Sequence, residues 1–368
     1  MKVLSSYLPF RKKVGNTEHK YMKNYSHLEK LYKNVKIYEN RHLISNFLQN
    51  IGFYVKRTGD KLGVDSDARK ALHQKVFVFP SSVQGIDVLL SRYFFPIRVL
   101  NSVPLVYHHG FPTNQYVGAS STEERREAIR DRNRLYRKTA CTLFSTRESI
   151  RRFSEVAPKD VQEKVVYAPY FLPKVEPIQP DSLEKKFSDY RPVRVLFVGS
   201  DGKRKGVHNL VKALNRICDQ YPDLRNNLKA TIITRDELPP CDFEVDKHEH
   251  LNHDSVLEAF RQSHIFCMPT LKDSYGLVYI EAMASGCAVV ADDSPVRREI
   301  LDDGDAGLMS DPQDPDDIAD KLLTLIQSPE YARTIGRRAR DRFQRYYHWR
   351  QVGKRYVRIL KDAASGKY

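Results

Sequence analysis

The sequence predicts an α/β protein with two domains, each built around a doubly wound parallel sheet. Short apolar runs alternate with amphipathic segments along most of the chain, which is typical of parallel strands covered by helices. The chain has 368 residues, more than one domain usually contains. Residues 170–192 are rich in proline, as expected of an interdomain linker. Together these observations favour two α/β domains that enclose a cleft.

The second half of the chain shows the alternation most clearly. Near-continuous apolar runs predict buried strands at 193–199, 228–234, 264–269 and 287–291. Apolar residues spaced three or four apart predict helices at 207–217, 254–260, 277–286 and 314–326. Asp254 or Ser255 can cap the second helix, Gly286 ends the third, and Asp314-Pro315 opens the fourth.

The first half repeats this pattern less regularly. Strands are expected at 75–80, 102–110, 140–145 and 164–169, and a charged helix at 123–138, whereas the polar stretch 20–72 yields no clear element. The predicted organisation is an N-terminal acceptor-binding domain, a linker, a C-terminal donor-binding domain and a final helix that returns to the N-terminal domain. The boundaries of these four parts are 1–172, 173–192, 193–345 and 346–368.

Composition restricts the partners and the compartment. The formal net charge of +15 favours anionic partners, namely nucleic acid, an acidic membrane surface or phosphorylated substrates. The five cysteines show no CxxC pair and no metal-finger spacing, which predicts reduced thiols in a cytoplasmic protein. The chain begins without the apolar run of a signal peptide, and its apolar stretches are too short to span a bilayer.

A basic loop follows the strand at 193–199. Its sequence GSDGKRKG (199–206) leads from a buried strand into a helix, so its glycines allow close backbone approach while Lys203, Arg204 and Lys205 supply positive charge. The glycine spacing matches neither a Walker loop nor the dinucleotide-binding fingerprint. The pattern favours phosphate binding over the alternative, a solvated basic turn.

Two carboxylates stand out in DSYGLVYIEAMASG (273–286). Asp273 is expected in the loop above the sheet, and Glu281 lies within an apolar helix with no Lys or Arg inside four residues. A carboxylate in such a segment is costly unless hydrogen-bond donors surround it. The vicinal hydroxyls of a ribose could supply them, and a structural pair with a distant Arg is the alternative.

The same stretch resembles the signature of retaining glycosyltransferases of family 4, in which seven residues separate two acids. FVGSDGKRKGVHNLVKAL, EILDDGDAGLMSDPQDPDDIADKLLTLI and FQRYYHWRQVGKRYVRIL support this resemblance, which is specific over about 193–360 and weak before it. It implies the GT-B architecture, in which two Rossmann-like domains enclose the active site. It also implies a last helix, around Trp349, that crosses back onto the N-terminal domain.

The resemblance implies a role for each matching residue. Glu281 would bind the ribose hydroxyls of a nucleotide-sugar donor, and Asp273 would contact hydroxyls of the transferred sugar. Lys205, with Arg204, would neutralise the departing diphosphate. The residues expected at the reacting sugar are His109, Asp273 and Lys205, with His108 as second choice to His109. Those expected to bind the donor are Gly15, Asn16, Gly199, Arg204, Lys205, Ser274, Tyr275, Gly276, Leu277 and Glu281.

Two positions depart from the family pattern. The family usually has Glu where this chain has Asp273, and the shorter side chain changes its reach. The family's phosphate-binding Arg often follows the first glycine, where this chain has Ser200. Arg204 is the residue expected to compensate. A degenerate, inactive transferase therefore remains an alternative.

The sequence thus predicts a retaining transferase that moves a sugar from a UDP- or GDP-sugar to a hydroxyl of a glycan, lipid-linked or small-molecule acceptor. No metal and no cofactor are expected, because the basic loop can neutralise the diphosphate. The arginine-rich helix at 123–138 is either a solvated face or a contact with an anionic membrane at the cytoplasmic side. An epimerase or hydrolase of the same fold and a nucleic-acid-binding protein are the alternatives, the latter disfavoured because no aromatic-basic module is present.

Overall fold

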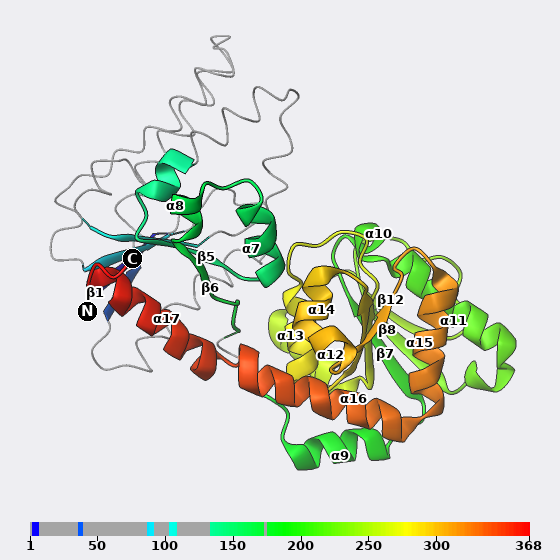
Figure 1. Cartoon of the computed structure of the whole chain (residues 1–368). Coiled ribbons are helices and arrows are strands. Elements are labelled where there is room, and N and C mark those ends of the chain that lie inside the picture. Colours follow the sequence, from blue (N-terminus) through cyan, green and yellow to red (C-terminus); the bar gives the residue numbers. More distant parts are fainter. Residues whose placement is uncertain (1, 7–35, 40–86, 92–102, 109–132, 173–174) are drawn as a thin grey trace, which may run out of the picture. The chain divides into compact units, whose positions relative to one another are not determined.

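The structure is a computed structural model that describes residues 2–6, 36–39, 87–91, 103–108, 133–172 and 175–368 (Figure 1). Its contacts divide the chain into two compact units. Unit 1 consists of Met1–Phe171 and Val352–Tyr368, and unit 2 is Leu172–Gln351. The four boundaries predicted from the sequence, and the cleft between the domains, stay predictions. The predicted strand at 75–80 and most of the predicted helix at 123–138 lie outside the described residues.

Unit 1 contains a six-stranded sheet in the order β2-β1-β3-β4-β5-β6, in which every pair is parallel. Its strands are β1 Lys2–Ser6, β2 Lys36–Glu39, β3 Val88–Ser91, β4 Leu105–His108, β5 Cys141–Phe144 and β6 Val165–Tyr167. The last three confirm the strands predicted within 102–110, 140–145 and 164–169. The strand order reverses at β1, which is the mark of a doubly wound sheet.

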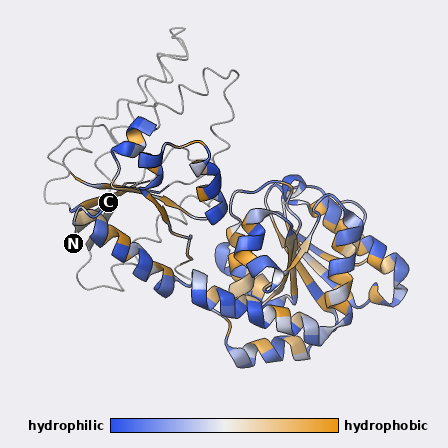
Figure 2. Ribbon diagram, in the orientation of Figure 1, coloured by the Kyte–Doolittle hydropathy of each residue, from blue (hydrophilic) through white to orange (hydrophobic). Residues whose placement is uncertain are grey.

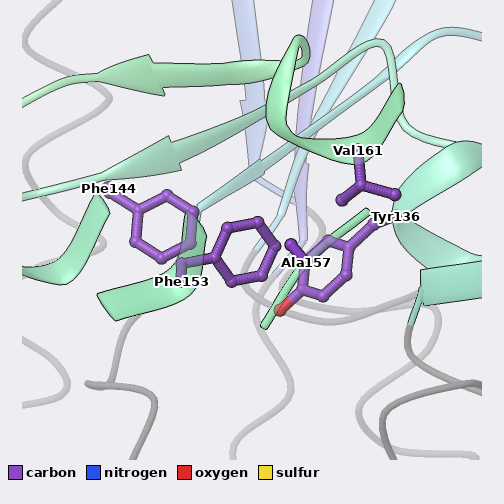
Figure 3. Close-up of a cluster of buried hydrophobic side chains, with 5 residues drawn as sticks. All are labelled: Tyr136, Phe144, Phe153, Ala157 and Val161. Carbon is purple, nitrogen blue, oxygen red and sulfur yellow. The ribbon is translucent and has the colours of Figure 1, made fainter. Parts of the chain in front are cut away.

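Aromatic side chains form a core beside this sheet. Residues 133–137 are helical, followed along the chain by α7 Arg147–Ser154 and α8 Lys159–Gln162. Tyr136, Phe144 and Phe153 meet edge-on or tilted, with Phe153 centred 5.1 Å from Tyr136 and 4.9 Å from Phe144 (Figure 3). Ala157 and Val161 complete this cluster. Burial of such rings is a main source of folding free energy, so the cluster fixes α7 and α8 relative to β5.

Unit 2 contains a second all-parallel sheet of six strands, in the order β12-β11-β10-β7-β8-β9. Its strands are β7 Val193–Val198, β8 Leu228–Ile233, β9 Glu244–His248, β10 Ile265–Met268, β11 Ala288–Asp292 and β12 Leu308–Ser310. All four strands predicted in this half are confirmed, while β9 and β12 were not predicted. The chain adds β8 and β9 on one side of β7 and then returns to place β10 on the other side. The topological switch point therefore lies between β7 and β10.

Helices cover both faces of this sheet, with α11 and α15 on one face and α12 and α13 on the other (Figure 1). The strands between them are mostly apolar, whereas the outer helix faces carry the polar residues (Figure 2). The helices of the unit are α9 Pro180–Ser188, α10 Gly202–Lys205, α11 Val207–Gln220, α12 His253–Gln262, α13 Leu277–Ala284, α14 Pro295–Leu301, α15 Pro315–Gln327 and α16 Pro329–Arg342. Short 3₁₀ turns occur at Pro222–Leu224 and Asp302–Gly304.

The chain leaves unit 2 through helical segments that are interrupted at His348, whose backbone is extended. A π-helical turn at Phe343–Tyr347 follows α16 and leads to α17, Trp349–Ala364, whose residues from Val352 onward belong to unit 1. There the ring of Tyr356 lies 5.6 Å from that of Phe171. The range 173–192, predicted as a linker, contains α9, which packs against α16 and buries Leu183 and Phe187.

Candidate active site

Two loops meet at the switch point of unit 2. The first, 199–206, follows β7 and contains the short helix α10, whose N-terminus is capped by Asp201. The second, 269–276, follows β10. Leu271 N–H donates to the carbonyl of Arg204 at 3.0 Å, and Gly206, at φ +84°, lies so close to Pro269 that a Cβ would stand 1.9 Å from its carbonyl oxygen. Only glycine fits there, and the contact holds the two loops together.

The loops bring Lys205 and Asp273 together, although 67 residues separate them in the sequence. Lys205 Nζ lies 2.5 Å from Asp273 Oδ2, and each side chain is only 13% exposed. Gly199 makes room for the lysine stem, since a Cβ at that position would lie 2.9 Å from Lys205 Cγ. The pair stands at the carboxyl ends of β7 and β10, where ligands of open α/β sheets bind.

The electrostatics of this pair favour an ionised carboxylate. Burial raises the pKa of Asp273, but Lys205 and Arg297 together outweigh it and bring that pKa below its ordinary value. Burial also lowers the pKa of Lys205, against the attraction of Asp273. A buried ion pair of this kind is costly to assemble, because both charges lose water. Such an arrangement is more common at functional sites than in structural cores.

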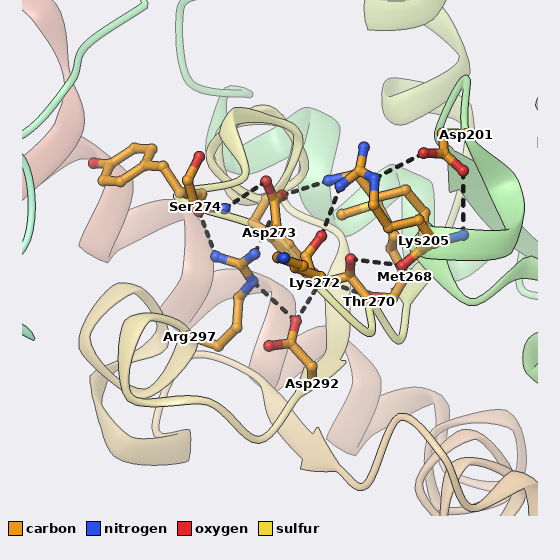
Figure 4. A network of polar contacts seen from close by, with 12 residues as sticks. Asp201, Lys205, Met268, Thr270, Lys272, Asp273, Ser274, Asp292 and Arg297 are labelled. Carbon is orange, nitrogen blue, oxygen red and sulfur yellow. Dashed lines mark hydrogen bonds and ion pairs between the residues drawn. The ribbon is translucent and has the colours of Figure 1, made fainter. Parts of the chain in front are cut away.

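Arg297, on α14, is the second cation at Asp273, and no role was predicted for it. Its Nη2 lies 3.3 Å from Asp273 Oδ2, its Nε donates to Asp292 Oδ1 at 3.0 Å, and Nη1 donates to the carbonyl of Tyr275 (Figure 4). Its guanidinium also covers the ring of Tyr279 at 4.3 Å. A signal existed in the sequence, since Asp292 and Arg297 follow the strand 287–291 at the same sheet edge as Asp273.

The start of α13 is shaped by Asp273 and Gly276. Asp273 Oδ1 accepts from the N–H of Ser274 at 2.8 Å, and Gly276 precedes the helix at φ +79°. A Cβ on Gly276 would lie 2.7 Å from the Tyr279 ring and 3.0 Å from Arg297 Cζ. Leu277 then begins the helix, whose first amides have no acceptor within the helix itself. This is a suitable place for an anion or a polar sugar.

Arg204 connects the two loops from the outside. Its Nε lies 2.8 Å from Asp201 Oδ2, and its Nη1 donates to the carbonyl of Lys272 at 2.6 Å. The guanidinium is 42% exposed, so it presents charge to the solvent beside the Lys205–Asp273 pair. Its compensation for Ser200 stays a prediction.

Glu281 is almost completely buried on α13, with 1% of its surface exposed. Nδ1 of His253, at the start of α12, lies 3.8 Å from Glu281 Oε1, which exceeds the length of a hydrogen bond. This histidine is half-buried and comes from a neighbouring helix. The alternative, a structural pair of Glu281 with a distant Arg, stays open. The ribose role of Glu281 stays a prediction.

Three predicted site residues, Gly15, Asn16 and His109, lie outside the described residues. His108, the second choice, ends β4 in unit 1 and is fully buried. Its ring lies 4.9 Å from that of Tyr170 and 5.9 Å from that of Tyr356. An imidazole enclosed by aromatic rings has the surroundings of a core residue.

Solved structures define the class of protein. The structure of Anabaena HepE in complex with UDP and glucose superimposes with a TM-score of 0.61 at 14% identity, over 98% of this chain and 100% of that one. Sucrose-phosphate synthase from Thermosynechococcus elongatus gives a TM-score of 0.65 at 15% identity, over 99% of both chains. These likenesses and the two doubly wound sheets confirm the predicted GT-B fold.

Sequence comparison concerns the second half of the chain. Residues 179–342 match the family model described as glycosyl transferases group 1. A phosphatidyl-myo-inositol mannosyltransferase of Mycolicibacterium smegmatis is 32% identical over 180 residues, which are 46% of this chain and 45% of that protein. A glycogen synthase of Mycobacterium tuberculosis is 25% identical over 188 residues, 48% of this chain and 44% of that protein. The chain thus aligns with about half the length of these curated relatives.

Two kinds of feature are absent from the residues that the structure describes. Within these residues no helix combines the length and the apolar character that crossing a membrane requires. Nor does this part of the chain bring three or more His, Cys, Asp or Glu side chains together in a way that could hold a metal ion.

Proposed function

We propose that the protein is a retaining glycosyltransferase that moves a sugar from a UDP- or GDP-sugar to a hydroxyl of a glycan, lipid-linked or small-molecule acceptor. The observation that carries the proposal is the buried Lys205–Asp273 pair at the switch point between β7 and β10. It lies beside the exposed guanidinium of Arg204 and the first amides of α13. The same site therefore provides a cation that can bind a diphosphate and a carboxylate that can accept hydrogen bonds from sugar hydroxyls.

The transfer requires a nucleoside diphosphate to depart while positive charge develops on the sugar. Lys205, Arg204 and the α13 amides stabilise the negative charge that grows on the diphosphate, without a metal ion in this proposal. Asp273 accepts hydrogen bonds from sugar hydroxyls, and Glu281 accepts them from the ribose. The acceptor attacks from the face that the diphosphate leaves, and a phosphate oxygen takes up the acceptor's proton. His109 is the proposed neighbour of the reacting sugar.

The relatives support the donor and the acceptor classes. HepE was crystallised with UDP and glucose, and several curated relatives are named phosphatidyl-myo-inositol mannosyltransferase. A lipid-linked acceptor agrees with the net charge of +15, which favours contact with an anionic membrane surface. We therefore place the protein in the cytoplasm, with a peripheral contact at the cytoplasmic membrane face.

A thermal-shift panel of UDP, GDP, ADP and their sugars tests the proposal. A ligand that binds only the native state raises the unfolding temperature according to its occupancy. We expect UDP or GDP, and the corresponding sugars, to raise it, and ADP to raise it less. Product analysis with the stabilising sugar, with and without candidate acceptors, then separates transfer from hydrolysis or epimerisation. The proposal fails if no nucleotide shifts the transition, or if the sugar is epimerised or released in equal amounts with and without acceptor.

A further inference from the structure

Arg297 joins three segments that meet at the switch point, and the proposed donor contacts do not use it. Its side chain is 1% exposed and is among the largest fully buried side chains of the described chain. Through one guanidinium it contacts Asp292 at the end of β11, the carbonyl of Tyr275 before α13, and the carboxylate of Asp273. Burial of an arginine is expensive, so a site that contains one needs a reason.

The guanidinium is held in place on every side. Asp292 Oδ1, which accepts from Arg297 Nε, also accepts from the Tyr279 hydroxyl at 3.1 Å. The Tyr279 ring lies against the guanidinium, and Gly276 leaves the space that Arg297 Cζ fills. A planar guanidinium with several directional hydrogen bonds would lose all of them if it rotated. These contacts therefore fix the orientation of Arg297.

Lys205 is bound differently. Its ammonium has one carboxylate partner among its described contacts, Asp273 Oδ2, and it stands at the end of a flexible four-carbon stem. It is also more exposed than Arg297. Of the two cations that share Asp273 Oδ2, one is therefore fixed and the other can turn toward a ligand.

This difference matters when a diphosphate enters. Lys205 is then attracted to the phosphate and withdraws from Asp273. A carboxylate that is largely shielded from water and has lost its only counter-ion takes up a proton. The neutral acid accepts sugar hydroxyls less well than the carboxylate does. A second cation that remains in place prevents this loss.

We propose that Arg297 is a positioning residue for Asp273, whose fixed guanidinium keeps the carboxylate charged and oriented after Lys205 has turned to the donor diphosphate. The inference rests on the proposed function for the part that Asp273 and Lys205 play in transfer. The contact between Arg297 and Asp273 exists without any ligand and does not depend on the proposed function.

The charged and titratable groups around Asp273 come from four elements. Within the described residues they are Lys205 and Arg204 from α10, Arg297 from α14, Tyr279 from α13 and Asp292 from β11. The net effect of burial, of Lys205 and Arg297, and of the Ser274 N–H is a pKa of Asp273 below its ordinary value. If Arg297 suffices, this carboxylate stays ionised at neutral pH when Lys205 is removed.

The first experiment needs no donor. Asp273 is followed by carboxyl ¹³C NMR in the intact protein labelled at aspartate, and its signal is assigned through Asp273→Asn. In Lys205→Met we expect Asp273 to remain ionised at pH 7, and in Lys205→Met/Arg297→Met we expect its titration midpoint to rise by at least two pH units. Protonation of Asp273 at pH 7 in Lys205→Met overturns the proposal. This single variant can overturn the proposal even if the double variant does not fold. An Asp273 that stays ionised at pH 7, with an unchanged midpoint, in the double variant also overturns it.

The second experiment connects Arg297 to transfer, with UDP-glucose as the probe. Arg297→Lys retains a charge but cannot contact Asp292, Tyr275 and Asp273 together. We expect kcat to fall at least tenfold, KM to change less than threefold, and the acid limb of the pH profile to move to higher pH. Arg298→Met is the matched control, because Arg298 is an exposed neighbour on α14 that pairs with Asp293 at 2.6 Å.

An unchanged kcat and acid limb in Arg297→Lys overturns the positioning role, as does an equal loss in Arg298→Met. Absence of turnover in the unmodified protein counts against UDP-glucose as donor, and the NMR titration then decides the role of Arg297.

Discussion

Two carboxylates in this protein each lie between two cations, yet their surroundings differ. In unit 1, Glu148 on α7 contacts Arg151 Nε at 2.8 Å and Arg152 Nε at 2.5 Å, and these arginine side chains are 61% and 39% exposed. In unit 2, Asp273 contacts Lys205 and Arg297, which are 13% and 1% exposed. The first cluster is a product of helical spacing, whereas the second is assembled by the fold from three segments, namely α10, the loop after β10 and α14.

The difference shows how to read ion pairs. Ion pairs between residues i and i+3 or i and i+4 on a solvent-exposed helix surface form readily and contribute little to stability. A buried cluster is expensive, and removing one partner leaves a charge without compensation. We therefore attribute the exposed cluster to local helix formation and the buried one to the site.

The largest effect is expected for Lys205→Ala, which removes a cation from the buried cluster. Turnover of the nucleotide sugar that the thermal-shift panel selects should fall by about 100-fold or more, as when an electrostatic contact to a transition state is lost. The nucleotide should still bind, because Arg204 and the α13 amides remain. Steady-state kinetics check this, with Lys212→Ala, at an exposed lysine on α11, as control. A normal kcat in Lys205→Ala would reject its role at the leaving group.

A smaller effect is expected for Glu281→Ala. Hydrogen bonds to a charged group contribute about 1.5–3 kcal/mol, so the Kd for the free nucleotide should rise about 10- to 100-fold. Calorimetric titration measures it, and circular dichroism confirms that the fold is intact. Glu258→Ala, on the exposed face of α12, is the matched control. Unchanged affinity in Glu281→Ala would show that this acid does not contact the ribose.

The smallest effect on turnover is expected for Glu148→Gln, which removes the carboxylate of the helical cluster. Turnover should not change, whereas stability at pH 7 should fall, because Arg151 and Arg152 stabilise the ionised carboxylate. The contacts with Arg151, against the effect of burial and together with Arg152, lower the pKa of Glu148 to about 2. Because the unfolded chain takes up this proton first, its contribution to stability is present above about pH 4.3 and lost as the pH falls toward 2. Urea unfolding at pH 7 and pH 3 measures the free energy of unfolding. Between these two pH values it should fall less in the variant than in the unmodified protein. An equal fall would contradict the depressed pKa of Glu148.

Much of the fold of unit 2 could be predicted because its central strands are buried on both faces. β7, β8, β10 and β11 are therefore near-continuous apolar runs. The edge strand β9, with sequence EVDKH, exposes polar residues and carries no such signal, and β12 has only three residues. Edge strands are commonly short or charged, which prevents unwanted pairing with other chains. Such strands lack the apolar run by which a strand is predicted from the sequence.

The site could be predicted in part for a related reason. The loops that carry Lys205 and Asp273 follow recognisable strands. The sequence therefore predicts that both loops lie at the carboxyl edge of the sheet. That they touch depends on β10 lying beside β7, and strand order is a tertiary property. Arg297 lies on a seven-residue helix opened by Pro295, too short for a helical period to show. Its partners come from β11, α13 and the loop after β10, so pairwise spacing could not reveal it.

The close approach of Gly206 to the Pro269 carbonyl packs the loop 199–206 tightly against the loop 269–276. An engineer who exchanged the segment after β10 to alter sugar choice would therefore also displace the basic turn after β7. Chimeras of this protein should be built with both segments transplanted as a matched set.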